Sequence, residues 1–177
     1  MNRKGSLLCW SVLCLATATS VAAHAEGAKT SYEMMSYSNS PGGEQIAARN
    51  YDGAIASTSR RSWFDETTAL VAMTNLCVAH TVKRELVEAD VACSKALSLA
   101  RRADAGTHGK FRRDSATAKA LLNRGVLRAV AGDALGAASD FRAAAGMRAV
   151  GDSAARNLAA LEASPARRVA SLGTTAE

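Results

Sequence analysis

The sequence predicts an all-α fold made of antiparallel helical hairpins that stack as a short solenoid. The main observation is a pattern of small residues that occurs twice with identical steps of 12, 4 and 3 positions. It comprises Cys77, Ala89, Cys93 and Ala96 in the first copy, and Gly125, Ala137, Phe141 and Ala144 in the second. Steps of 3 and 4 place residues on one helix face, where small side chains let two helices approach closely. Stacked hairpins of this kind usually bind other molecules rather than catalyse reactions.

Residues 1–25 are expected to be a signal peptide. Arg3 and Lys4 begin it, residues 7–23 carry no charge and are mainly apolar, and Ala23-His24-Ala25 has the small-x-small form of a cleavage site. Cleavage would make Glu26 the first mature residue, which predicts a periplasmic or secreted protein. A retained membrane helix is the alternative, and we disfavour it because the apolar stretch is short and a polar segment follows.

Residues 26–43 are expected to form a flexible lead-in. They are rich in Ser, Gly and Tyr and show no sustained apolar period. Helical pattern begins at Glu44, and residues 44–61 resemble the turn and second helix of a truncated hairpin. Pro41 would break a full first helix in front of them.

Two complete hairpins are expected at residues 65–100 and 114–148. Asp65 is a suitable N-cap for the first hairpin, while Gly132 and Asp133 suit the turn inside the second. Asp152 is expected to cap a closing helix over residues 152–163. Its Asn157-Leu158-Ala159 triplet repeats Asn123-Arg124-Gly125 after 34 positions, and Asn75-Leu76-Cys77 is an earlier copy. Residues 164–177 are expected to be a disordered tail.

Residues 101–113 are expected to form an inserted basic linker between the hairpins. It contains one acid, Asp104, and five basic residues, namely Arg101, Arg102, Lys110, Arg112 and Arg113. These account for much of the formal net charge of +6, so the remaining chain is not built around nucleic acid. Two interpretations stay open: a solvated loop, or a contact with an anionic surface or acidic partner.

The second copy resembles the tetratricopeptide repeat, through Asn123-Arg124-Gly125, Gly132-Asp133, Ala137, Asp140-Phe141 and Ala144. The first copy departs from that pattern at Cys77, Cys93 and Arg84-Glu85. The resemblance covers residues 44–163 and implies a right-handed solenoid whose first helices line a groove for an extended or helical polypeptide. By this resemblance the groove would present Thr74, Val78, Thr81, Val82, Leu122, Asn123, Val126 and Val130. Only Asn123 and Asn157 fit the family's clamp for a terminal carboxylate.

Cys77 and Cys93 are expected to form a disulfide. They lie equally far from the turn at Arg84-Glu85, so they face each other across the hairpin, and export would expose them to an oxidising compartment. Two separate buried thiols are the alternative. His80 lies one helical turn from Cys77, but zinc would need further ligands and only His108 remains. We therefore expect His80 to be a half-buried packing residue. We expect neither a metal nor a cofactor.

The sequence thus predicts a non-catalytic, exported protein- or peptide-binding module that acts as a scaffold or adaptor through its groove. No phosphate-binding loop or Ser/His/Asp set supports an enzyme. The alternative function is binding of an anionic surface through residues 101–113. The groove itself has two competing occupants, a segment of the same chain near residues 32–37 or a second copy of the protein.

Overall fold

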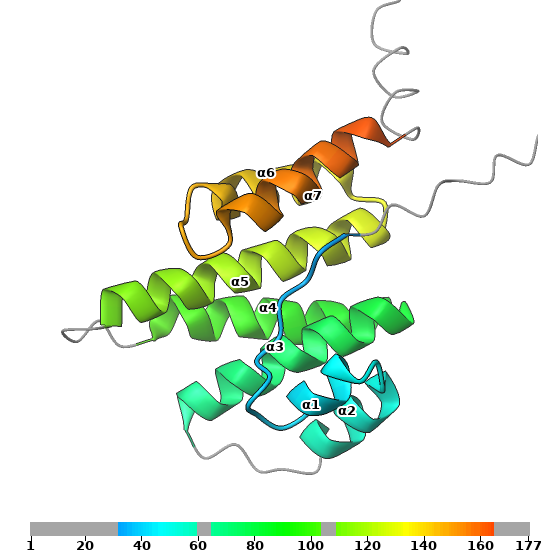
Figure 1. Ribbon diagram of the computed structural model, residues 1–177, viewed down its shortest axis with the longest axis vertical. Coiled ribbons are helices and arrows are strands. Elements are labelled where there is room, and N and C mark those ends of the chain that lie inside the picture. The colour runs from blue at the N-terminus through cyan, green and yellow to red at the C-terminus, as the bar shows by residue number, and fades with distance from the viewer. Residues whose placement is uncertain (1–31, 60–64, 104–108, 165–177) are drawn as a thin grey trace, which may run out of the picture.

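A computed structural model describes residues 32–59, 65–103 and 109–164 of the 177-residue chain (Figure 1). These ranges contain helices and no strand, which confirms the all-α class. The helices are α1 (Gly43–Ala47), α2 (Tyr51–Ser59), α3 (Glu66–Lys83), α4 (Leu86–Arg102), α5 (Gly109–Val130), α6 (Ala134–Ala145) and α7 (Gly151–Ala163). The expected signal peptide and nearly all of the expected tail lie outside the described residues.

Consecutive helices pack side by side, from α1 and α2 at one end to α6 and α7 at the other (Figure 1). Tight turns join α3 to α4 and α5 to α6. Arg84 ends α3 in the left-handed conformation, with φ of 61°, and Gly132 does the same after α5, with φ of 89°. No described helix is long and apolar enough to cross a membrane.

The predicted N-caps are confirmed at two of three helices. Asp65 accepts a hydrogen bond from the Thr68 N–H at 2.8 Å, and Asp133 accepts one from the Gly136 N–H at 2.8 Å. The third prediction is wrong, because α7 begins one residue earlier and Val150 occupies its N-cap. Asp152 lies in the first turn instead, where a carboxylate still interacts favourably with the helix dipole.

The repeated small residues lie where neighbouring helices make their closest contacts. Gly125 lies so near Phe141 that an added Cβ would come within 2.6 Å of the ring, and Phe141 is fully buried. At the equivalent positions of α3 and α4, Cys77 and Cys93 form the predicted disulfide, with Cα atoms 4.7 Å apart. The two repeats therefore use the same two positions for different contacts: a glycine–phenylalanine contact in one and a covalent bond in the other.

The inserted linker is shorter than the sequence predicted. α4 continues through Arg101 and Arg102, and α5 already begins at Gly109. Arginine and lysine are good helix formers, and basic residues in the last turn of α4 interact favourably with the C-terminal end of the helix dipole. These local preferences extend both helices into the basic segment.

The expectation of a flexible lead-in is wrong for residues 32–43. Residues 32–37 run along the molecule with hydrogen bonds to α7, α5 and α3 in turn, and residues 38–42 then bend into α1 (Figure 1). Its hydrogen-bond partners are side chains far along the sequence and not a neighbouring strand. A local search for periodicity therefore finds no signal in it.

Candidate polypeptide-binding site

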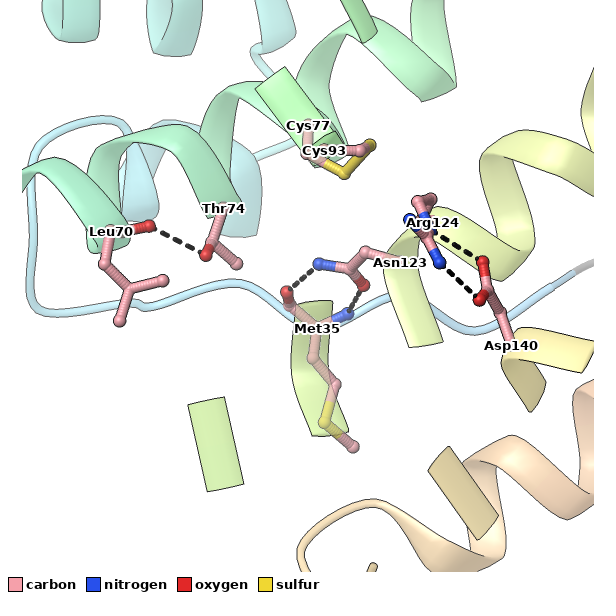
Figure 2. The surroundings of a disulfide bond; sticks show 8 residues. All are labelled: Met35, Leu70, Thr74, Cys77, Cys93, Asn123, Arg124 and Asp140. Carbon is pink, nitrogen blue, oxygen red and sulfur yellow. Dashed lines mark hydrogen bonds and ion pairs between the residues drawn. A yellow bond between two sulfur atoms is a disulfide. The ribbon is translucent and has the colours of Figure 1, made fainter. Parts of the chain in front are cut away.

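Three asparagines hold the extended segment by its main chain. Asn157 accepts the Glu33 N–H at 2.8 Å and donates to the Glu33 C=O at 2.8 Å. Asn123 makes the same pair of bonds to Met35, at 2.8 and 2.7 Å, as Figure 2 shows. Asn75 binds Tyr37 in this way at 2.8 and 3.1 Å. We call Asn75, Asn123 and Asn157 the asparagine ladder.

The spacing of the ladder matches the geometry of an extended chain. In such a chain the N–H and C=O of one residue point to the same side, and every second residue repeats that orientation. A side-chain amide offers one acceptor and a two-proton donor, so it complements both main-chain groups of a single residue. The ladder therefore contacts alternate residues through their main-chain groups, independently of their side chains. The segment runs opposite to the order of the repeats, from α7 to α3.

The ladder is rigid because its members are buried. Each of the three asparagines is at most 1% exposed, and each occupies the first position of the repeated triplet on α3, α5 or α7. The nearby Thr74 hydroxyl is satisfied within α3, where it donates to the Leu70 C=O at 2.8 Å (Figure 2). With the segment in place, the three helices thus enclose the three amides almost completely.

Asn75 also fixes the exit of the segment towards α1. Its Nδ2 donates to the Ser40 hydroxyl at 2.9 Å and to the Pro41 C=O at 3.1 Å. Gly43 then comes so close to the segment that an added Cβ would lie 2.0 Å from the Tyr37 C=O. This close approach explains why a glycine stands where α1 begins.

Side chains add specific contacts at both ends of the segment. Arg156 binds the Glu33 carboxylate through two nitrogens, at 2.7 and 2.8 Å. This pairing, with a smaller contribution from Ser153, lowers the pKa of Glu33 to about 2. At the other end, the Lys119 ammonium lies 4.3 Å from the centre of the Tyr37 ring, a cation–π contact. Burial raises the pKa of the Tyr37 hydroxyl.

A cavity of about 340 Å³ adjoins the segment, and we call it the side cavity. Its walls come from the segment, from α1 and α2, and from α3 and α5. They are formed by Tyr32, Met34, Ile46, Tyr51, Val78, Thr81, Val82, Arg84, Val126 and Val130. Met34 faces this cavity, whereas Met35 lines a hollow on the opposite side of the segment together with Arg156. That alternation is the one expected of an extended chain.

The residues predicted to line the groove separate into three groups. Asn123 binds the segment, as described above. Val78, Thr81, Val82, Val126 and Val130 line the side cavity. Leu122 is fully buried in the core, and Thr74 is 1% exposed and turned to its own helix, so neither presents an open surface. The sequence interpretation missed the roles of Asn75 and Asn157, although the asparagine repeated in all three triplets was the signal for them.

A charged cluster on α5 and α6 has a structural role. Arg124 holds both oxygens of Asp140, at 2.8 and 2.7 Å (Figure 2). Arg128 reaches the same carboxylate at 2.9 Å. The Asp140 side chain is only 5% exposed, so two cations compensate its burial. Pairing with Asp140 raises the pKa of Arg124.

His80 belongs to a group of charged side chains near the surface and does not form a site with the cysteines. Its Nδ1 lies 2.6 Å from the Glu85 carboxylate, and Lys83 contacts that same carboxylate at 2.6 Å. Cys77 is held in the disulfide. Within the described ranges, no group of three or more His, Cys, Asp and Glu side chains is placed to hold a metal ion.

The predicted basic patch is only partly visible. Arg101 and Arg102 are exposed on α4, and Arg102 contacts Ser98 at 2.8 Å and Glu66 at 3.5 Å. Arg113 is half-buried on α5. Lys110 and Arg112 belong to the first turns of α5, and their side chains lie outside the described part of the structure. The structure therefore describes the side chains of three of the five basic residues.

No protein-family model matches the chain, and neither the curated proteins nor the solved structures contain a significant match to it.

Proposed function

We propose that this protein is a non-catalytic, exported polypeptide-binding module that acts as a scaffold or adaptor. Its binding site is the face of α3, α5 and α7 that carries the asparagine ladder, and its ligand is an extended segment of a partner. One observation carries the proposal: three buried asparagines each bind both main-chain groups of alternate residues in an extended segment. Such a device recognises polypeptide as a chemical class.

The proposal includes the architecture that the resemblance implies, a short right-handed solenoid of tetratricopeptide-like hairpins. Three features support it. The equivalent small residues Ala89 and Ala137 are both fully buried, and consecutive helices pack on one another. The three ladder asparagines also stand at the same repeat position on α3, α5 and α7, as expected if these helices are equivalent units.

The resident occupant of the site is residues 32–37 of the same chain, one of the two competing occupants that the sequence left open. A tethered segment acts at an effective concentration in the millimolar range, so it competes strongly with any partner. In our proposal a partner displaces the resident segment and takes over its hydrogen bonds to the ladder. The resident segment then prevents binding of weak, unspecific chains.

Export is supported by the disulfide between Cys77 and Cys93, because such bonds persist in oxidising compartments. The alternative function, binding of an anionic surface through residues 101–113, rests on charge alone. Arg102 already contacts Ser98 and Glu66. We therefore favour the ladder as the functional surface.

The test uses the full mature chain with a weakened resident segment. We call the double substitution Glu33→Arg and Tyr37→Ala the clasp variant, since it sets Arg156 against a like charge and removes the ring beneath Lys119. A fluorescent peptide with the sequence of residues 32–41 should bind the clasp variant about tenfold more tightly than it binds the wild type, measured by anisotropy.

The matched control adds Asn123→Ala to the clasp variant. Within the described ranges the side chain of Asn123 bonds only to Met35, so helicity should stay constant while peptide affinity falls. Peptide binding that is indifferent to Asn123→Ala, in protein of unchanged helicity, would refute the proposed function.

A further inference from the structure

The resident segment leaves the side cavity unfilled. Met34 contributes to its wall, yet about 340 Å³ remains beside that side chain. The opposite wall is apolar, with Val78 and Val126 each at most 4% exposed. Volumes in this range are those of pockets that bind ligands. A larger side chain at the position of Met34 would therefore find room and apolar contacts.

One residue in the wall of this cavity, Thr81, carries a buried hydroxyl without a hydrogen-bond partner in the described part of the structure. Thr81 is 2% exposed, and its Oγ1 is the one buried side-chain nitrogen or oxygen in the described residues without a hydrogen-bond partner. Buried polar atoms almost always have a partner, so this hydroxyl indicates a missing one. Arg84, also in the wall, makes no ion pair within the described ranges.

We propose that the side cavity is the specificity pocket of the binding site and accepts an aromatic side chain with a polar atom, tryptophan or tyrosine, from the partner. This inference rests on the proposed function and names the kind of segment that the site prefers. The ring would pack against Val78 and Val126, and its N–H or O–H would donate a hydrogen bond to the Thr81 hydroxyl. The Arg84 guanidinium would lie over the face of the ring in a cation–π contact.

The flanking contacts define the rest of the preferred segment. Arg156 selects an acidic residue immediately before the aromatic one, as it does with Glu33. Lys119 selects a second aromatic residue three positions after the first, as it does with Tyr37. The preferred partner is thus an extended polypeptide of the pattern acidic–aromatic–x–x–aromatic. The resident segment satisfies the two outer positions and lacks the aromatic one between them.

This difference supplies a means of exchange. A partner and the resident segment make the same hydrogen bonds to the ladder, so those bonds give the partner no advantage over a tethered competitor. Filling the side cavity gives the partner an interaction that the resident segment does not make. A ligand displaces a competing state only to the extent of such a difference.

The test compares two peptides on the clasp variant of the full mature chain. One has the sequence of residues 32–41, and the other carries Met34→Trp in that sequence. The tryptophan peptide should bind about tenfold more tightly. A third peptide with Met35→Trp is the matched control, because Met35 lines a different hollow, of about 440 Å³, whose other walls come mainly from small or polar residues: Arg148, Ala149, Gly151, Asp152, Ser153 and Arg156. It should bind no more tightly than the unmodified peptide.

A second measurement does not depend on opening the site. Met34→Trp in the otherwise unaltered full chain should raise the melting temperature, whereas Met35→Trp should not. Combining Met34→Trp with Thr81→Val should remove part of the gain, since valine has the shape of threonine without its hydroxyl.

The outcomes separate the two proposals. If the unmodified and tryptophan peptides bind the clasp variant equally, or Met34→Trp lowers the melting temperature of the full chain, the specificity pocket is wrong and the proposed function stands. If neither peptide binds the clasp variant, the proposed function fails and the inference fails with it.

Discussion

The Asn123 side chain binds both main-chain polar groups of Met35, accepting from its N–H at 2.8 Å and donating to its C=O at 2.7 Å, although 88 positions separate the two residues. This one contact connects the middle of α5 to a segment that precedes all the helices. Repeated between Asn75 and Tyr37 and between Asn157 and Glu33, it holds alternate residues of the segment against one helical face.

Asn123→Ala should reduce the free energy of unfolding by about 1 to 3 kcal/mol, because it leaves two main-chain groups of Met35 without their partner. Denaturant unfolding followed by circular dichroism measures the change. Asn39→Ala is the matched control: Asn39 is exposed, its side chain makes no hydrogen bond within the described ranges, and its replacement should change stability by less than about 0.5 kcal/mol. Equal effects of the two substitutions would mean that the ladder does not hold the segment.

The Glu33 carboxyl should titrate near pH 2, as its pKa of about 2 requires. Its pKa is lowered on folding, so its contribution to stability is complete above the ordinary value of 4.5 and is lost as the pH falls from there towards 2. Arg156→Gln should bring the pKa of Glu33 back towards 4.5. Carboxyl chemical shifts recorded against pH give both values. A Glu33 titration that is the same in wild type and Arg156→Gln would contradict the pairing.

Gly125→Ala should destabilise the protein by about 1 to 3 kcal/mol, since the new methyl group would lie 2.6 Å from Phe141 and the ring must move. Helix propensity alone predicts the opposite sign, because alanine is preferred to glycine inside a helix. Gly146→Ala serves as the control. Its φ is −69°, and its nearest contact would be 3.6 Å away, so stability should stay the same or rise slightly. If Gly125→Ala proves neutral or stabilising, α5 and α6 do not approach as described.

Reduction of the disulfide should lower the free energy of unfolding by about 3 kcal/mol, the value that loop-closure entropy gives for a loop of this length. The bridge joins residues 16 positions apart and connects α3 to α4. Unfolding curves with and without a reductant measure the loss. Simultaneous Cys77→Ala and Cys93→Ala should reproduce it and abolish any further effect of the reductant. An unchanged curve on reduction of the wild type would show that the bond does not stabilise the fold.

Local spacing was enough to predict the helices around the repeated small residues and the disulfide. Positions equidistant from a short turn must face each other, which is why Cys77 and Cys93 could be paired without a structure. The charge of Arg101 and Arg102 suggests a linker and places the end of α4 too early, because a helix tolerates arginine and its last turn favours basic residues.

The position of the lead-in could be named only as one alternative among several. Its contacts span 38 to 124 positions along the chain, and neither the segment nor the helices show them by periodicity. The asparagine repeated at residues 75, 123 and 157 was the available signal. Its meaning depends on the distance between helices, which sequence spacing does not provide.

Amide hydrogen exchange along residues 33–37 of the full wild-type chain tests the central claim most directly, because main-chain recognition of alternate residues has its own signature. The amides of Glu33, Met35 and Tyr37 donate to the ladder, whereas those of Met34 and Ser36 have no partner among the described residues. The account predicts slow exchange at the three odd-numbered positions and fast exchange at the two between them. Uniformly fast exchange, or protection that does not alternate, would contradict it.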